Sequence, residues 1–163
     1  MIIDAIMDEY AHRPVLLHES VALLLTEDSG TYVDGTLGGG GHTREILNRL
    51  GIAGKVIGFD ADARAIEECS QRFRGEIGKR LVLVNRNFSE LGEWLADQNI
   101  GEVNGILLDL GVSSFQFDAE VGFSYRSDSP LDMRFRRDRG TGAKEIVNEY
   151  SAEELVRIFR EYG

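Results

Sequence analysis

Three carboxylates are the side chains whose positions point most directly to chemistry. Asp34, Asp60 and Asp109 each stand at or near the end of a short apolar segment, in the stretches YVD, KVIGFD and GILLDL. The last stretch is typical of a strand buried on both faces. An unpaired carboxylate inside such a strand costs roughly several kcal/mol, so Asp109 should face a cleft or a partner. We therefore expect Asp109 to be the leading reactive group.

Asp34 opens a glycine-dense stretch, DGTLGGGGHT, that ends in a helical pattern from Arg44 to Leu50. Glycines allow a close approach of the backbone to a ligand, and a turn before a helix presents N–H groups to a nucleotide-like molecule. A dinucleotide turn would need glycine at Thr43, and a triphosphate loop would need a Lys-Ser/Thr pair. An acid followed by small residues and glycines is instead typical of class I S-adenosylmethionine methyltransferases, although Thr36 occupies the first glycine slot of D-x-G-x-G. The alternative is a flexible loop that binds nothing.

Two further residues have spacings that suit such a ligand. Asp60 lies 19 residues beyond Gly41, where a nucleotide-binding fold places an acid to accept hydrogen bonds from ribose hydroxyls. Its alternative role is the N-cap of the next helix. Phe88 follows the apolar segment LVLVN and could cover an adenine ring, or it could simply pack in the core.

The elements around these residues alternate between strand and helix. We expect strands around Tyr32–Val33 and over 55–60, 81–85 and 105–110, separated by helical patterns. This alternation predicts an α/β, doubly wound, Rossmann-like sheet, in which ligands bind at the carboxyl ends of the strands. Asp34, Asp60, Phe88 and Asp109 all fall at those ends.

Composition limits the remaining possibilities. The 163 residues suffice for one domain with a real core, and a single cysteine, Cys69, excludes an internal disulfide. Residues 1–122 carry 20 acids and 10 bases, whereas residues 123–163 carry 8 of each. The N-terminus has no signal-like pattern and no apolar run reaches membrane-spanning length, so we expect a soluble cytoplasmic protein that does not associate with a membrane. We also expect no metal site.

An arginine-rich stretch follows Phe117. Its five arginines within fourteen residues suit bidentate phosphate contacts, but the neighbouring acids could equally hold them in surface ion pairs; they are Arg126, Arg134, Arg136, Arg137 and Arg139. A capping box at Ser151–Glu154 then predicts a final helix.

Together these stretches resemble the bacterial RsmH (MraW) family, which N4-methylates a cytosine in the decoding centre of 16S ribosomal RNA. The matching motifs are HRPVLLHE, YVDGTLGGGGHT, GFD, NFSEL, GILLDLGVSS and SPLDMRF. The resemblance implies a class I methyltransferase fold, a 16S rRNA or small-subunit partner, and contacts to S-adenosylmethionine from Gly40, Gly41, His42, Asp60, Phe88, Asp109 and Gln116. Phe115 stands where the family usually has proline, which affects the placement of Gln116.

The resemblance also implies an incomplete fold, because family members are roughly twice as long. Residues 1–116 would form the first four strands of the cofactor core, and residues 117–163 would begin an inserted helical substrate-recognition domain. A strand order of 3-2-1-4, as in related methyltransferases, would leave the strand 105–110 at an edge where chains could self-associate.

Methyl transfer to an amine needs alignment more than acid catalysis. An acceptor that holds an N–H of the cytosine amine would turn its lone pair toward the methyl group, and Asp109, Ser113 or Ser114 could do this. Two alternatives remain: a small-molecule methyltransferase on the same sheet, and a nucleotide-binding module without catalysis.

Overall fold

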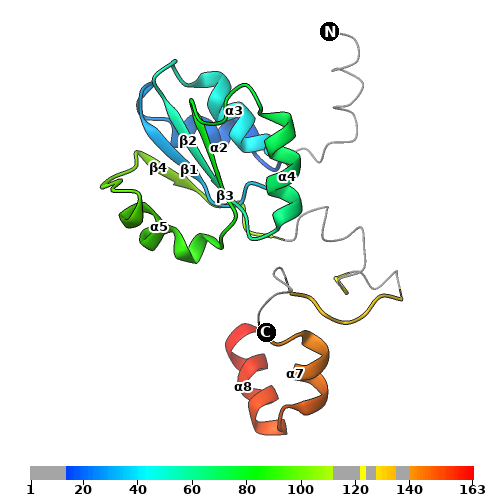
Figure 1. Ribbon diagram of the computed structural model, residues 1–163. Helices are drawn as coiled ribbons and strands as arrows, with labels where there is room; N and C mark the ends of the chain where they lie inside the picture. Colours follow the sequence, from blue (N-terminus) through cyan, green and yellow to red (C-terminus); the bar gives the residue numbers. More distant parts are fainter. Residues whose placement is uncertain (1–13, 112–121, 124–127, 135–139) are drawn as a thin grey trace. The chain divides into compact units, whose positions relative to one another are not determined.

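The computed structural model describes residues 14–111, 122–123, 128–134 and 140–163. The chain divides into two compact units, Met1–Gly111 and Val112–Gly163. The first unit alternates helices and strands (Figure 1), in the order α2 (Leu17–Leu24), β1 (Thr31–Asp34), α3 (Gly41–Arg49), β2 (Lys55–Phe59), α4 (Ala63–Arg72), β3 (Leu81–Val84), η1 (Phe88–Glu90), α5 (Leu91–Asp97) and β4 (Gly105–Leu107).

The four strands form one parallel sheet in the order β3-β2-β1-β4. The predicted order and the predicted α/β class are therefore confirmed. The chain builds the sheet outward from β1 to β3 and then returns to add β4 on the other side of β1, so the switch point at which doubly wound sheets bind ligands lies between β1 and β4. Asp34 is in register with Gly58 on one side and with Leu107 on the other, so the strand ends lie level with one another.

Helices cover both faces of this sheet (Figure 1), and each face has its own apolar cluster. On one face, residues of α2, α3 and α4 pack on side chains such as Tyr32 and Val56. On the other face, α5 packs on Val33, Ile57, Phe59 and Val84. The ring of Phe59 meets that of Trp94 edge to face at 5.4 Å. Alternate residues of each strand therefore face opposite cores, as buried parallel strands require.

The strand expected over 105–110 is shorter than predicted. β4 ends at Leu107, and the side chains of Ile106, Leu108 and Leu110 are 48%, 45% and 68% exposed. β4 has β1 as its neighbour on one side and lies at the edge of the described sheet. The apolar run GILLDL predicted a strand that is buried on both faces. In the described sheet, β4 pairs with β1 only, and three apolar side chains of the run are exposed to solvent.

The second unit contains α7 (Ala143–Glu149) and α8 (Ala152–Tyr162). Ser151 and Glu154 form the predicted capping box, in which Ser151 Oγ accepts from Glu154 N and Glu154 Oε2 accepts from Ser151 N. The proposed role of residues 117–163 in substrate recognition stays a prediction. Among the described residues no helix is long and apolar enough to cross a membrane.

Candidate active site

The glycine-rich turn after β1 is fastened to the end of β2. Leu37 N donates to Phe59 O at 2.9 Å, and Gly38 N donates to Asp60 Oδ2 at 2.8 Å. Gly38 has a φ of +48°, and a Cβ there would find its nearest heavy atom at 3.9 Å, so this side of the turn is open. Gly40 has a φ of +77°, and a Cβ there would lie 2.6 Å from the Phe73 ring. Glycine at 40 is therefore required by packing against α4 as well as by its backbone angle.

Asp60 directly follows β2, at the carboxyl end of the strand. Its carboxylate accepts Gly38 N on Oδ2 and Asp62 N on Oδ1, both at 2.8 Å. Burial raises its pKa above the ordinary value of 3.8, although these hydrogen bonds act in the opposite direction. The alternative role is excluded, because the N-cap of α4 is Asp62, whose side chain accepts from Arg64 N. The Asp60 carboxylate has no capping role and keeps unused lone pairs.

Asp34 is a structural carboxylate beneath the turn. It is fully buried, and its two oxygens accept from Thr43 Oγ1 at 2.7 Å and from Thr36 N at 3.2 Å. Burial is the main cause that raises its pKa above the ordinary 3.8. This hydrogen bond links β1 to the first turn of α3. The only signal for it in the sequence is a hydroxyl residue, Thr43, nine residues after the acid that opens the glycine-rich motif.

Asp109 lies beyond the end of β4 and not inside a buried strand. Its side chain is 45% exposed, which corrects the prediction that burial would force it into a cleft. Asp109 N donates to Thr36 Oγ1 at 2.7 Å. Its Oδ2 lies 3.9 Å from His42 Nδ1, which is too long for a hydrogen bond but close enough for electrostatic attraction if the imidazole is protonated.

Two of the predicted site residues begin α3. Gly41 is its first residue, and a Cβ there would collide with the ring of Pro14. His42 follows in the first turn and is only 5% exposed, yet its Nε2 has no hydrogen-bond partner among the described residues. Such an atom is uncommon in a folded protein, and it suits a hydrogen bond to a ligand.

Phe88 is the first residue of η1 and is 37% exposed. It lies close to the end of β1, because a Cβ on Gly35 would be 3.4 Å from the Cβ of Phe88. Asn87 caps η1 by accepting from Ser89 N at 2.9 Å. As predicted, Asp34, Asp60, Phe88 and Asp109 all lie at or just beyond the carboxyl ends of the strands. Ser113, Ser114 and Gln116 lie outside the described residues.

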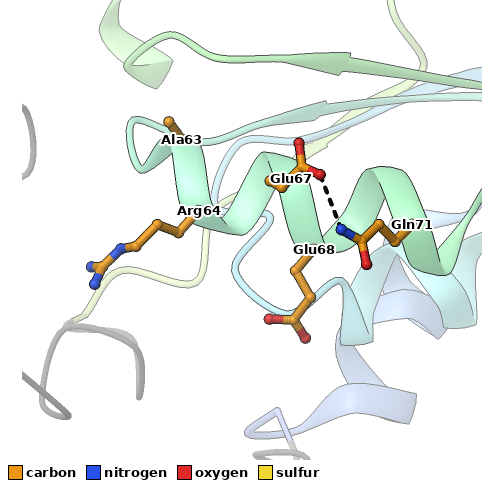
Figure 2. A pocket seen from close by; sticks show the side chains of 5 residues that line it. All are labelled: Ala63, Arg64, Glu67, Glu68 and Gln71. Atoms are coloured by element: carbon orange, nitrogen blue, oxygen red, sulfur yellow. Dashed lines mark hydrogen bonds between the residues drawn. The ribbon is translucent and has the colours of Figure 1, made fainter.

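A shallow depression lies along α4 (Figure 2). Its volume is about 520 Å³, and it is wide open to solvent. Its described lining consists of Ala63, Arg64, Glu67, Glu68 and Gln71, all from one helix. Several of these side chains have partners nearby: Glu67 accepts from Gln71 at 3.0 Å, and Arg64 pairs with Asp62 at 2.7 Å. This described lining does not bring polar groups from different elements together, as a binding site would.

Comparison with known proteins decides the family. A model of the MraW methylase family matches residues 9–163. The chain belongs to the MraW methylase family. A relative named ribosomal RNA small subunit methyltransferase H from Limosilactobacillus fermentum is 48% identical over 159 residues, covering 96% of this chain and 50% of the relative. One of the same name from Clostridium botulinum (strain Loch Maree / Type A3) is 46% identical over 156 residues, covering 95% and 50%.

Two solved structures are also similar in part. A rRNA methylase from Streptococcus thermophilus is 28% identical with a TM-score of 0.40, covering 51% of this chain and 48% of that one. A SAM-dependent O-methyltransferase from Thermotoga maritima is 19% identical with a TM-score of 0.45, covering 55% and 36%. This member of the MraW methylase family spans about half the length of the curated relatives it matches.

Proposed function

We propose that this chain forms the cofactor-binding part of an S-adenosylmethionine-dependent methyltransferase that modifies the N4 amine of a cytosine in small-subunit ribosomal RNA. The observation that carries the proposal is the membership in the MraW methylase family over residues 9–163. The relatives' names supply the class of RNA, and the family resemblance supplies the cytosine amine. A cytoplasmic location follows from such a substrate.

The residues at the carboxyl ends of the strands are suited to this cofactor. The space beside Gly38 is open, and the Asp60 carboxylate accepts N–H groups of Gly38 and Asp62 and has room for a further donor. His42 Nε2 is buried without a partner among the described residues. The excess of acids over bases in residues 1–122 also favours a cationic ligand. We propose that Gly40, Gly41, His42, Asp60, Phe88, Asp109 and Gln116 hold the cofactor, although Gln116 lies outside the described residues.

S-adenosylmethionine, when bound, supplies an electrophilic methyl group on a sulfonium centre. The Asp60 carboxylate would accept the ribose hydroxyls, and the exposed face of Phe88 would cover the adenine. Asp109 would accept an N–H of the cytosine amine and so turn the nitrogen lone pair toward the methyl group. Ser113 and Ser114 are alternatives for this orienting role and lie outside the described residues. Such alignment accounts for much of the rate enhancement in transfers of this kind.

Labelled methyl transfer tests the proposal in the full-length protein. The substrates are small ribosomal subunits, free ribosomal RNA and free cytidine, each with the wild type and with Asp109→Asn. We expect label in the RNA-containing substrates, and a turnover at least about tenfold lower for Asp109→Asn. Its thermal midpoint should stay nearly unchanged, because a substitution at a 45% exposed side chain normally costs about 0.5 kcal/mol or less.

The other outcomes separate the alternatives. Transfer only to free cytidine or another small molecule would favour a small-molecule methyltransferase. Cofactor binding without any transfer would favour a non-catalytic module. Losses of turnover and thermal midpoint in proportion would make Asp109 a structural residue.

A further inference from the structure

The hydroxyl of Thr36 joins the two strands whose ends carry the site. β1 and β4 pair in parallel with Asp34 opposite Leu107, and the last main-chain bond between them runs from Gly35 N to Leu107 O at 2.9 Å. The chain after β1 then turns away into the glycine-rich turn. After β4, the next main-chain N–H that points toward the β1 side is that of Asp109, and it donates to Thr36 Oγ1 at 2.7 Å. A side-chain oxygen therefore replaces the main-chain carbonyl that a regular parallel ladder would supply.

The main chain of Thr36 is held in place by the buried carboxylate of Asp34. Thr36 N donates to Asp34 Oδ1 at 3.2 Å, and Thr43 Oγ1 donates to the other oxygen of the same carboxylate at 2.7 Å. Asp34 is fully buried. Thr36 thus links a rigid, buried carboxylate to the exposed segment that follows β4.

This arrangement gives a reason for the departure from D-x-G-x-G at position 36. A glycine there could keep the N–H bond to Asp34 but would leave Asp109 N without its acceptor. The β4 segment needs such a tie because the flanking side chains of Leu108 and Leu110 are 45% and 68% exposed, so packing holds it only weakly.

We propose that Thr36 is a positioning residue that acts through Asp109. Its hydroxyl fixes the main chain of Asp109, and this in turn holds the Asp109 carboxylate near His42, at 3.9 Å. The consequence for the cofactor and the amine rests on the proposed function, whereas the restraint on the main chain of Asp109 does not.

The test compares six forms of the full-length protein: wild type, Thr36→Val, Thr36→Ser, Thr31→Val, Asp109→Ala and the double variant Thr36→Val/Asp109→Ala. Valine keeps the branched shape of threonine and removes the hydroxyl, while serine restores it. Thr31→Val is the matched control, because Thr31 begins the same strand and bonds Asn104 through its main-chain N and O. Two quantities are measured: the hydrogen exchange rate of the Asp109 amide by nuclear magnetic resonance, and the affinity for S-adenosylmethionine by calorimetry.

We expect the Asp109 amide of Thr36→Val to exchange faster and its cofactor affinity to fall by about three- to tenfold, the usual effect of one hydrogen bond. Thr36→Ser and Thr31→Val should stay close to the wild type in both measurements. In an Asp109→Ala background, Thr36→Val should weaken binding no further, because the side chain that Thr36 positions is gone.

Three results would overturn the proposal: unchanged exchange of the Asp109 amide in Thr36→Val, failure of Thr36→Ser to restore affinity, or an undiminished effect of Thr36→Val in the Asp109→Ala background. If the wild type itself fails to bind S-adenosylmethionine, the proposed function is overturned instead, and the exchange rates still decide whether Thr36 restrains Asp109.

Discussion

Gly38 N donates a 2.8 Å hydrogen bond to Asp60 Oδ2, so the turn that follows β1 is tied to the carboxylate that directly follows β2. Asp60 therefore has two tasks. It orders the glycine-rich turn, and it offers its remaining lone pairs to a ligand. The two tasks can be separated by experiment.

Asp60→Ala is expected to remove most of the affinity for S-adenosylmethionine. A hydrogen bond from a ribose hydroxyl to a charged acceptor contributes about 1.5–3 kcal/mol, and the variant also releases Gly38 N. Calorimetry on the full-length protein measures the effect. Glu67→Ala is the control, since it removes one negative charge from the exposed surface of α4 and leaves the turn intact. Equal affinity in Asp60→Ala and the wild type would exclude Asp60 from the site.

Thr43→Val is expected to destabilise the fold more at neutral than at acid pH. Burial raises the folded-state pKa of Asp34 above 3.8, and the bond from Thr43 Oγ1 opposes that rise. A raised pKa in the folded state means that stability decreases as pH increases from about 3.8 through the folded-state pKa, because ionisation costs more in the folded chain than in the unfolded one. Without the Thr43 hydroxyl, the ionised Asp34 carboxylate loses a charge-assisted hydrogen bond, whereas the neutral carboxyl loses a weaker one.

Urea unfolding at two pH values measures this difference. The free energy of unfolding should fall by about 1.5–3 kcal/mol near pH 7 and by clearly less near pH 4. Thr31→Val, in the same strand as Asp34, should show no such dependence on pH. A loss for Thr43→Val that is the same at both pH values would mean that the hydroxyl does not stabilise the charged form of Asp34.

Of the five arginines in the arginine-rich stretch, Arg134 is the one among the described residues. Arg134 is bound within its own loop, because its Nε and Nη2 donate to the Asp132 carboxylate at 2.7 and 2.9 Å and its Nη1 donates to Gly140 O at 3.0 Å. This supports the ion-pair interpretation for Arg134. The other four arginines, at positions 126, 136, 137 and 139, lie outside the described residues.

Neutralising Arg136 and Arg137 together should therefore flatten the salt dependence of RNA affinity, by roughly 0.7 in the logarithmic slope for each RNA phosphate that these side chains neutralise in the wild type. Arg134→Gln should change this slope much less, because its guanidinium is already engaged by Asp132. Affinities measured over a range of salt concentrations test the prediction. If the double variant keeps the slope of the wild type, these arginines do not bind phosphates.

The 163-residue chain alone is expected to self-associate through β4 or to bind S-adenosylmethionine weakly, and not to methylate RNA. β4 ends the described sheet, and Ile106 on this strand is 48% exposed. Ile106→Lys should reduce association in sedimentation experiments, whereas Ile52→Lys, at a side chain that is 94% exposed outside the sheet, should not. A strictly monomeric chain at high concentration, with the cofactor affinity of the full-length protein, would speak against this prediction.

Much of the fold could be predicted because its causes are local in the sequence. Apolar segments of strand length indicate the strands, and their alternation with helices indicates parallel pairing, so Asp60 and Phe88 could be placed at the carboxyl ends of the strands. The strand order, in contrast, was implied by the resemblance to related methyltransferases. The extent of β4 could not be predicted, because the run GILLDL does not reveal whether a strand has one neighbour or two.

The hydrogen bonds beneath the turn could not be predicted for a different reason. Thr36 and Thr43 are small residues in a glycine-rich motif, and nothing in their spacing indicates which carboxylate or N–H each hydroxyl meets. Their roles depend on the path of the turn relative to the ends of β1 and β4, and that path is set by tertiary packing such as the contact of Gly40 with Phe73.

The most direct test is to identify the nucleoside that the full-length protein modifies. Small ribosomal subunits that lack the modification are incubated with the protein and S-adenosylmethionine, and their ribosomal RNA is digested to nucleosides for mass spectrometry. We predict N4-methylated cytidine with the wild type and a strong reduction with Asp60→Ala and Asp109→Asn. Methylation at another atom or base, or full activity in both variants, would contradict the proposed function or the proposed site, respectively.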